Sequence, residues 1–354
     1  MWKLTDEQEA YQDALRGWLG SVADSAQVRD WLAKGDRATF EGRFVADGFA
    51  GVGLAEELGG QGGGVVELAL TSELLGRFAA PSSIWLATVL AAPALAARPE
   101  VAEAALAGAG ATIAVAAGLP PDAAPVLEID AEGRVTGEVD RVLAADGATH
   151  LVVRTERDGR SELRLVSMAA DEVSVAPREL LDRSRTVADL RLSGAPSERL
   201  EVDGDAVLAD AATRAAVLVA ADSLGAAQRM LDLAVEYSLQ RKQFGVPIGS
   251  FQAVKHAAAT ILVGVEAARS IVYFAAASVE SQAESHRLHA AAAKAQVTEQ
   301  GVQAADGALT LHGAIGYTWE HDLHLFYKRA KLDEQLFGSP KQWNERIADG
   351  LSLL

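Results

Sequence analysis

The chain has 354 residues, of which 49% are hydrophobic and 23% charged, and this composition predicts two or three packed units rather than one small binding module or a disordered chain. Its formal net charge of −17 repels phosphate backbones, and no basic stripe interrupts it, so we expect no nucleic-acid partner. The absence of cysteine excludes disulfides, thiolate metal sites and cysteine nucleophiles.

The N-terminal residues are acidic and do not form a cationic segment followed by an apolar one. No uninterrupted apolar run reaches about 20 residues, the length that a membrane-spanning helix requires. We therefore expect a soluble cytoplasmic protein with no membrane partner.

Residues 1–108 are predicted to form an N-terminal helical domain. Thr5 is a candidate N-cap, and Leu4, Tyr11 and Leu15 begin an apolar face. A glycine-rich run at 59–64 separates one element from the next helix. This run lacks the Lys-Ser/Thr ending of a P-loop, so we interpret it as a connector.

Residues 109–203 are predicted to form a β-rich middle domain. The β-type segments cover residues 135–139, 151–154 and 162–166. They follow one another without intervening helices, which favours antiparallel strands over βαβ units.

Residues 204–354 are Ala-rich and are predicted to form a helical bundle. One largely apolar helix contains Ala215, Leu224 and Leu231, and further long helices are expected at 251–280 and 286–311. Helices, then strands, then a four-helix bundle give an α+β fold class.

Three sequence blocks converge on one family. They read GLAEELGG at 53–60, RKQFGVPIGSFQ at 241–252 and LHGAIGYTWEH at 311–321. In these blocks and in the order of its zones, essentially the whole chain resembles the acyl-CoA dehydrogenases. The resemblance implies FAD as cofactor, an acyl-CoA substrate and, as electron acceptor, an electron-transfer flavoprotein or another acceptor.

The resemblance assigns four residues of the second block to FAD binding: Arg241, Gln243, Phe244 and Gln252. An arginine can fork onto a pyrophosphate, an amide can hydrogen-bond it, and an aromatic face can pack on the adenine half. Taken alone, the same residues also fit a solvated helix C-terminus, with Gly245 as its cap.

The third block is a glycine turn that, in the family, meets the FAD of a neighbouring subunit. The resemblance carries this role to His312, Gly313, Ala314 and Gly316. Ala314 departs from the family pattern, because it adds a methyl group at a second-glycine position. His312, His321 and His324 have no recognisable zinc spacing, so we expect no metal.

The family needs a carboxylate base, and neither of its two usual positions carries one here. Those positions hold Ala215 and Phe337 in this sequence. Four acids lie nearby in sequence: Asp222, Glu320, Asp333 and Glu334. Each is most simply an exposed or salt-bridged carboxylate, so we name no catalytic base. The flavin-facing strand and loop of the family's middle domain also match residues 114–123 poorly.

The leading hypothesis is a base-deficient subunit resembling those of actinobacterial α2β2 acyl-CoA dehydrogenases that act on steroid-derived CoA thioesters. In such a heterotetramer, a homologous partner would supply the base and this chain would complete the partner's FAD site. Two alternatives stay open: a homotetrameric enzyme with a relocated carboxylate such as Asp222 or Glu334, and a non-catalytic scaffold of the same fold.

Overall fold

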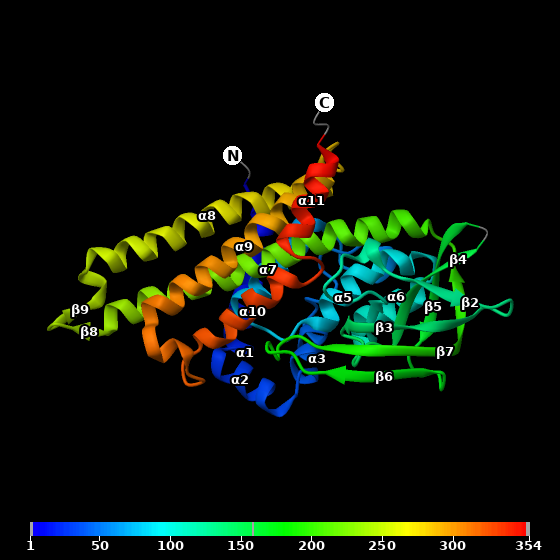
Figure 1. The fold of residues 1–354 in the computed structure, drawn as a ribbon, viewed down its shortest axis with the longest axis horizontal. Helices are drawn as coiled ribbons and strands as arrows, with labels where there is room; N and C mark the ends of the chain where they lie inside the picture. Colours follow the sequence, from blue (N-terminus) through cyan, green and yellow to red (C-terminus); the bar gives the residue numbers. More distant parts are fainter. Residues whose placement is uncertain (1–2, 158, 352–354) are drawn as a thin grey trace.

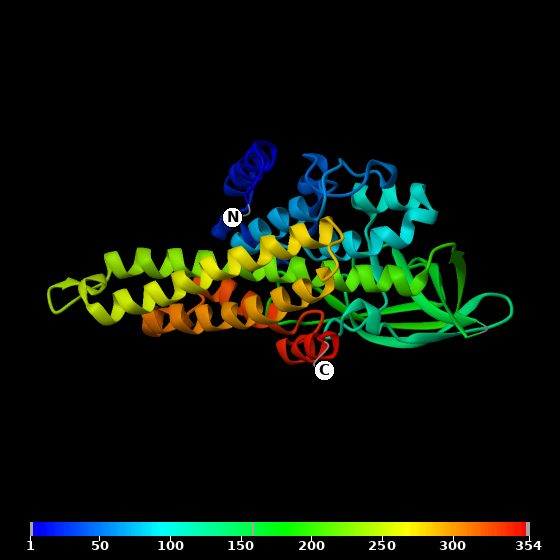
Figure 2. The same ribbon diagram turned by 90° about the horizontal axis from the view of Figure 1, so that it is seen from above.

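The computed structural model describes residues 3–157 and 159–351. The chain begins with helices, continues with a sheet and ends with a long helical bundle (Figure 1). The view from above shows the N-terminal helices along one side of the bundle and the sheet at one of its ends (Figure 2). The predicted α+β class with this order of elements is confirmed.

The N-terminal part contains six α-helices and short 3₁₀ and π segments among the described residues. Thr5 caps α1 through a reciprocal capping box with Gln8, as the sequence predicts. The glycine run lies between η1 (Glu56–Leu58) and α4. The bounds are α1 Asp6–Val22, α2 Ser25–Lys34, α3 Ala38–Ala46, α4 Val65–Arg77, α5 Ser83–Ala91, η2 Ala92–Ala97, α6 Pro99–Ala104 and η3 Ala105–Ala109.

The middle part forms a seven-stranded sheet in which the predicted strand segments lie within β3, β4 and β5. Most neighbouring strands are antiparallel, as predicted, but β4 pairs in parallel with both β1 and β2. The bounds are β1 Ala111–Ile113, β2 Val126–Ile129, β3 Arg134–Leu143, β4 His150–Arg157, β5 Arg160–Ser167, β6 Val173–Arg178 and β7 Val187–Leu200. The domain limits at residues 108 and 203 remain our proposal.

The C-terminal part is a bundle whose long helices agree closely with the predicted ones. The 37-residue helix α7 runs through its centre and buries most of its side chains, because it packs against α4, α8, α9 and α10. The bounds are α7 Gly204–Gln240, β8 Lys242–Gln243, β9 Val246–Pro247, η5 Ile248–Ser250, α8 Gln252–Glu280, α9 His286–His312, η6 Gly313–Tyr317, α10 Leu323–Gln335 and α11 Pro340–Gly350.

Two glycines allow α4 and α7 to approach each other closely. A Cβ atom at Gly225 would lie 1.8 Å from the Glu73 carbonyl oxygen, and one at Gly76 would lie 2.1 Å from the Asp222 carbonyl oxygen. Any side chain would push the helices apart. One apolar core therefore continues from the N-terminal helices into the bundle, while a second, smaller core lies within the sheet.

The helix α8 covers one side of the bundle and leaves much of its own surface uncovered. Within the described ranges it is the one helix long and apolar enough to cross a membrane, and 28% of its most apolar window is buried. Its exposed apolar side chains include Leu262, Val263 and Phe274.

Candidate functional site

A short β-hairpin carries much of the second sequence block, the first of the two predicted to contact the flavin. Helix α7 ends at Gln240, and strands β8 and β9 then form a hairpin that projects beyond the end of the bundle (Figure 1). Phe244 and Gly245 make its turn with φ angles of +52° and +81°, so the turn needs the freedom of a glycine at the second position. The hairpin holds its side chains away from the body of the chain.

The side chains of this block are exposed and have few partners. Phe244 is 93% exposed and touches Phe251 edge-on, with ring centroids 6.2 Å apart. The Gln243 Nε2 atom donates to the adjacent Lys242 carbonyl, at 2.9 Å. Arg241 and Gln252 are exposed as well. A guanidinium, two amides and an aromatic face are thus available to a ligand or to another chain.

The third block contains the end of α9 and the turn η6, and it combines exposed and buried residues. Gly313 has φ +62° and open space around it, and Ala314 is exposed, so the extra methyl group of Ala314 meets no crowded backbone. Gly316 and His312 are buried. A Cβ atom at Gly316 would lie 2.8 Å from Leu309, so this glycine serves the packing of the turn.

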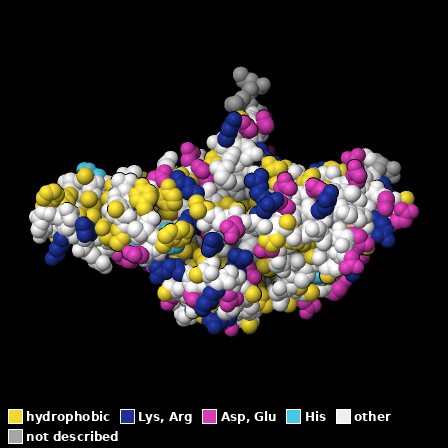
Figure 3. All heavy atoms as spheres, turned by 60° about the horizontal axis from the view of Figure 1, so that its bottom comes forward, with side chains coloured by type: hydrophobic (Ala, Val, Ile, Leu, Met, Phe, Trp, Pro, Cys, Tyr) yellow, Lys and Arg dark blue, Asp and Glu magenta, His cyan; other side chains and the backbone are white. Residues whose placement is uncertain are grey.

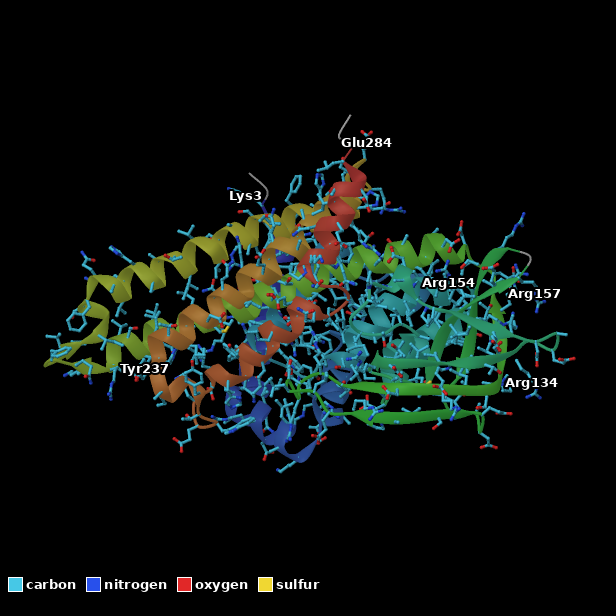
Figure 4. All side chains as sticks on the ribbon, in the orientation of Figure 1. Lys3, Arg134, Arg154, Arg157, Tyr237 and Glu284 are labelled. Atoms are coloured by element: carbon cyan, nitrogen blue, oxygen red, sulfur yellow. The ribbon has the colours of Figure 1, made fainter. Side chains whose placement is uncertain are left out.

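The ring of His312 connects the two blocks. It stacks on Tyr237 with centroids 4.9 Å apart, and Tyr237 lies one helical turn before Arg241 at the end of the bundle (Figure 4). The Nδ1 atom of His312 contacts the Ala308 carbonyl oxygen at 2.7 Å, and burial lowers the pKa of the imidazole. Burial thus favours the neutral form of His312, and its ring packs behind the glycine turn.

The two positions at which the resemblance places the family's base are enclosed. Ala215 is fully buried in α7, and Phe337 is 3% exposed. The Phe337 backbone N–H donates to the Ala117 carbonyl at 2.6 Å, within the poorly matching 114–123 stretch. The space beside the Phe337 ring measures about 10 Å³, which is room for about one water molecule. Among the described residues, no carboxylate lines this space, and its volume is too small for an acyl chain.

Asp222 is engaged by two buried arginines. Its Oδ1 accepts from Arg329 Nε at 2.7 Å, and its Oδ2 accepts from Arg185 Nη2 at 2.7 Å and Arg329 Nη2 at 2.8 Å. Burial opposes ionisation, but the two guanidiniums outweigh it and hold the pKa of Asp222 below its usual range. An ionised carboxylate with both oxygens occupied is a poor general base.

Asp333 lies fully buried next to Asp222. Burial and the Asp222 carboxylate raise the pKa of Asp333 well above its usual range. With Asp333 protonated, the two arginines are balanced by Asp222 and by Asp182, whose Oδ2 lies 3.9 Å from Arg329 Nη1. This cluster joins α7, α10 and the segment before β7.

Sequence analysis missed the buried cations of this region and the role of Tyr237. Lys294 is fully buried in α9, and its ammonium donates to the carbonyl oxygens of Asp333 and Gly338 at 2.9 and 2.8 Å, which fixes the loop that carries Phe337. In the sequence, the position of Lys294 within a run of alanines was the one sign that this lysine is buried. The burial of Arg185 and Arg329 could not be predicted in this way, because their ion-pair partners are distant in sequence.

The two histidines of the third block, His312 and His321, are brought together, but not as a metal site. The rings of His312 and His321 lie 4.5 Å apart, while His324 packs on Trp319 at 5.0 Å. Within residues 3–157 and 159–351, no group of three or more His, Cys, Asp or Glu side chains could hold a metal ion.

Comparisons with known families and proteins agree with this architecture. Residues 5–107 match the profile described as "Acyl-CoA dehydrogenase, N-terminal domain", and residues 203–351 match "Acyl-CoA dehydrogenase, C-terminal domain". The acyl-CoA dehydrogenase IpdE2 of Mycobacterium tuberculosis is 34% identical over 97% of this chain and 96% of its own length. FadE34 of the same organism is also 34% identical over 97% of this chain, which spans 48% of FadE34.

Two solved heteromeric structures have the same fold. A variant of the Tcur3481–Tcur3483 steroid ACAD matches with a TM-score of 0.87 and 27% identity, over 97% of both chains. The ChsE4–ChsE5 complex from Mycobacterium tuberculosis matches with a TM-score of 0.87 and 24% identity, over 99% of both chains.

Proposed function

Because this chain belongs to the acyl-CoA dehydrogenase family, we propose that it is the base-deficient subunit of a heteromeric FAD-dependent acyl-CoA dehydrogenase. Family membership confirms the predicted oxidoreductase class and FAD as the family's cofactor. In this proposal a homologous partner supplies the carboxylate base, and this chain completes the partner's FAD site.

The observation that carries the proposal is the closed space around Phe337. An aromatic side chain stands where the base is expected, and about 10 Å³ of space remains beside it. Asp222, one of the two relocated carboxylates considered above, is bound by two arginines. The homotetramer with its own relocated base is therefore the weaker reading.

The exposed end of the bundle fits half of a flavin site. FAD, when bound, accepts the hydride from the acyl-CoA β-carbon. Arg241 would hold the pyrophosphate with its guanidinium fork, Gln243 would add an amide hydrogen bond, and Phe244 would cover the adenine half. All three are exposed and have few partners, as expected of residues that act on a ligand held by a second chain.

The surface of the bundle supports a homologous partner. Hydrophobic side chains gather on the narrow end of the molecule in Figure 3. Leu239 and Val263 of α7 and α8 are 67% and 70% exposed. Uncovered apolar side chains on two adjacent helices favour burial against another chain.

The relatives suggest the wider context. One solved relative is named a steroid ACAD and another is the ChsE4–ChsE5 complex. We therefore propose that the substrate of the complex is a steroid-derived acyl-CoA thioester. We also propose that an electron-transfer flavoprotein or a similar acceptor reoxidises the flavin, and that the complex is cytoplasmic.

Purification of this chain alone and together with a co-expressed homologous subunit tests the proposal. We expect the lone chain to be nearly colourless and inactive, and the complex to be yellow and active on an acyl-CoA. Full FAD loading and turnover by the lone chain would overturn the proposal. A colourless, inactive preparation in every assembly would favour the scaffold instead.

A further inference from the structure

A cavity of about 410 Å³ lies between α3, α5 and η3 in the N-terminal part. Pockets that bind small molecules have volumes of this order. Most of the wall is apolar, and the residues of this part include Phe40, Phe44, Val45, Ile84 and Leu106. The cavity therefore has room for the hydrocarbon part of a small molecule.

The cavity is separate from the region of Phe337. Ile84 and Thr88 of α5 line the cavity, whereas Ala87 and Leu90 of the same helix line the small space beside Phe337. Residues four apart share one side of a helix, so the two sets lie on different sides of α5. Helix α5 thus forms a wall between the cavity and the position at which the resemblance places the base.

One acidic side chain stands on this apolar wall. Among the described residues that line the cavity, Glu41 of α3 is the only charged one, and it is half-buried. The two hydroxyl groups on the wall already have partners within the chain. The Oγ of Ser82 accepts from Arg185 Nη1 at 3.0 Å, and the Oγ1 of Thr88 accepts from the Ala111 N–H at 3.1 Å. Glu41 is therefore the polar group with the most capacity left for a ligand.

The Glu41 carboxylate lacks a cation of its own. Among the described residues none forms an ion pair with it. Arg37, whose charge acts on Glu41, pairs instead with Asp146, with 3.7 Å between Arg37 Nη2 and Asp146 Oδ2. A partly desolvated carboxylate without a cation is unfavourable, and a cation that enters the cavity would relieve this.

The titration of Glu41 agrees with this environment. Burial raises its pKa to about 7, and the charge of Asp146 adds to the rise. The Ile84 backbone N–H and Arg37 act in the opposite direction but do not outweigh burial. About half of the molecules therefore carry the negative charge at pH 7, and nearly all carry it at pH 8.

We propose that this cavity binds an organic amine, whose protonated nitrogen pairs with the Glu41 carboxylate and whose hydrocarbon body fills the apolar space. The volume fits a body of roughly 10–20 non-hydrogen atoms. The proposal stands independently of the function proposed above. An acyl-CoA carries several negative charges on its phosphates, so the Glu41 carboxylate would repel it.

Calorimetric titration of the full chain with two probes tests the ion pair. The probes are 4-phenylbutylamine and 4-phenylbutanol, which share one carbon skeleton and differ in a terminal ammonium or hydroxyl group. At pH 8 we expect the amine to bind at least tenfold more tightly, the effect of one charge-assisted hydrogen bond. Between pH 6 and pH 8 its affinity should rise about tenfold, because Glu41 ionises while the amine stays protonated. The affinity for the alcohol should stay constant.

Glu41→Gln keeps the size of the side chain and removes its charge. We expect this variant to lose both the preference for the amine and the pH dependence, with alcohol binding within about twofold of the wild type. Its Tm at pH 8 should be unchanged or higher, because an unpaired, partly buried charge is removed. Glu103→Gln in α6 is the matched control, since Glu103 is exposed and does not line the cavity.

Four results would overturn the proposal. They are no binding of the amine to the wild type, equal binding of the two probes, a retained amine preference in Glu41→Gln, and an equal loss of that preference in Glu103→Gln. The last result would mean that the amine responds to the net charge of −17 rather than to the cavity. Loss in Glu41→Gln with retention in Glu103→Gln is the result that supports the site.

Discussion

The ring of Tyr237 stacks on the imidazole of His312, with 4.9 Å between their centroids. Tyr237 belongs to the helix that leads into the hairpin, and His312 ends the helix that leads into the glycine turn. Two segments about 70 residues apart are thereby held at the same end of the bundle.

Tyr237→Leu should loosen this end while keeping the fold. An aromatic pair of this kind contributes about 0.5–1.5 kcal/mol, so we expect a Tm lowered by about 1–4 °C. The FAD content of the co-purified complex, read from its visible absorbance, should fall by at least half. Phe274→Leu is the control, because it breaks a similar ring contact with His289 on another part of the bundle. Equal FAD loss in both variants would contradict a specific role of the Tyr237–His312 pair.

Arg241→Ala should weaken FAD binding in the complex about 10–100-fold, because a charge-assisted bond to a phosphate contributes about 1.5–3 kcal/mol. The Tm of the Arg241→Ala variant should not change, since the Arg241 side chain is exposed. Arg241→Lys should recover only part of the affinity, because an ammonium lacks the planar fork. The control is Arg157→Ala at the opposite end of the molecule (Figure 4). Undiminished FAD affinity in Arg241→Ala would remove this residue from the site.

Phe337→Glu puts a carboxyl group where the resemblance places the family's base, but the substitution should not make the lone chain active. The carboxyl would be buried beside about 10 Å³ of space, without a partner, and we expect the free energy of unfolding to fall by about 3–5 kcal/mol. Phe337→Leu should lose less, since it adds no charge. Denaturant unfolding and turnover with an acyl-CoA are the measurements. Turnover by the lone Phe337→Glu chain would mean that it holds an active site of its own.

The two neighbouring aspartates should respond differently to neutralisation. Asp222→Asn leaves two buried arginines without their carboxylate and should cost about 3–5 kcal/mol of unfolding free energy at pH 7. Asp333→Asn should change it by less than about 1 kcal/mol, or increase it, because Asp333 already carries a proton.

The pH dependence of the free energy of unfolding follows from the same difference in protonation between Asp222 and Asp333. The pKa of Asp333 is raised on folding, so its contribution to wild-type stability is fully present below its unfolded value of about 3.9 and is lost as the pH rises. Asp333→Asn removes this loss, so its stability relative to the wild type should improve between pH 4 and pH 7. Equal costs for the two substitutions would contradict a protonated Asp333.

Much of the fold could be predicted because local patterns determine it. The capping box at Thr5 and the long proline-free apolar helices α8 and α9 follow from nearby residues. The parallel pairings of β4 could not be predicted, since they depend on which strands meet in space. The sequence block that contains Arg241 was recognisable, but the exposed hairpin that displays it was not predicted, because its two short strands pair only across the turn at Phe244 and Gly245. The closed space at Phe337 was not, because it depends on α5, the sheet and the loop fixed by Lys294 together.

Native mass spectrometry of the complex tests the central claim most directly, because it counts chains and FAD in one measurement. We predict an α2β2 assembly that holds two FAD molecules for four chains, and no FAD on the lone chain. An active assembly of this chain alone with one FAD for each subunit would contradict the account.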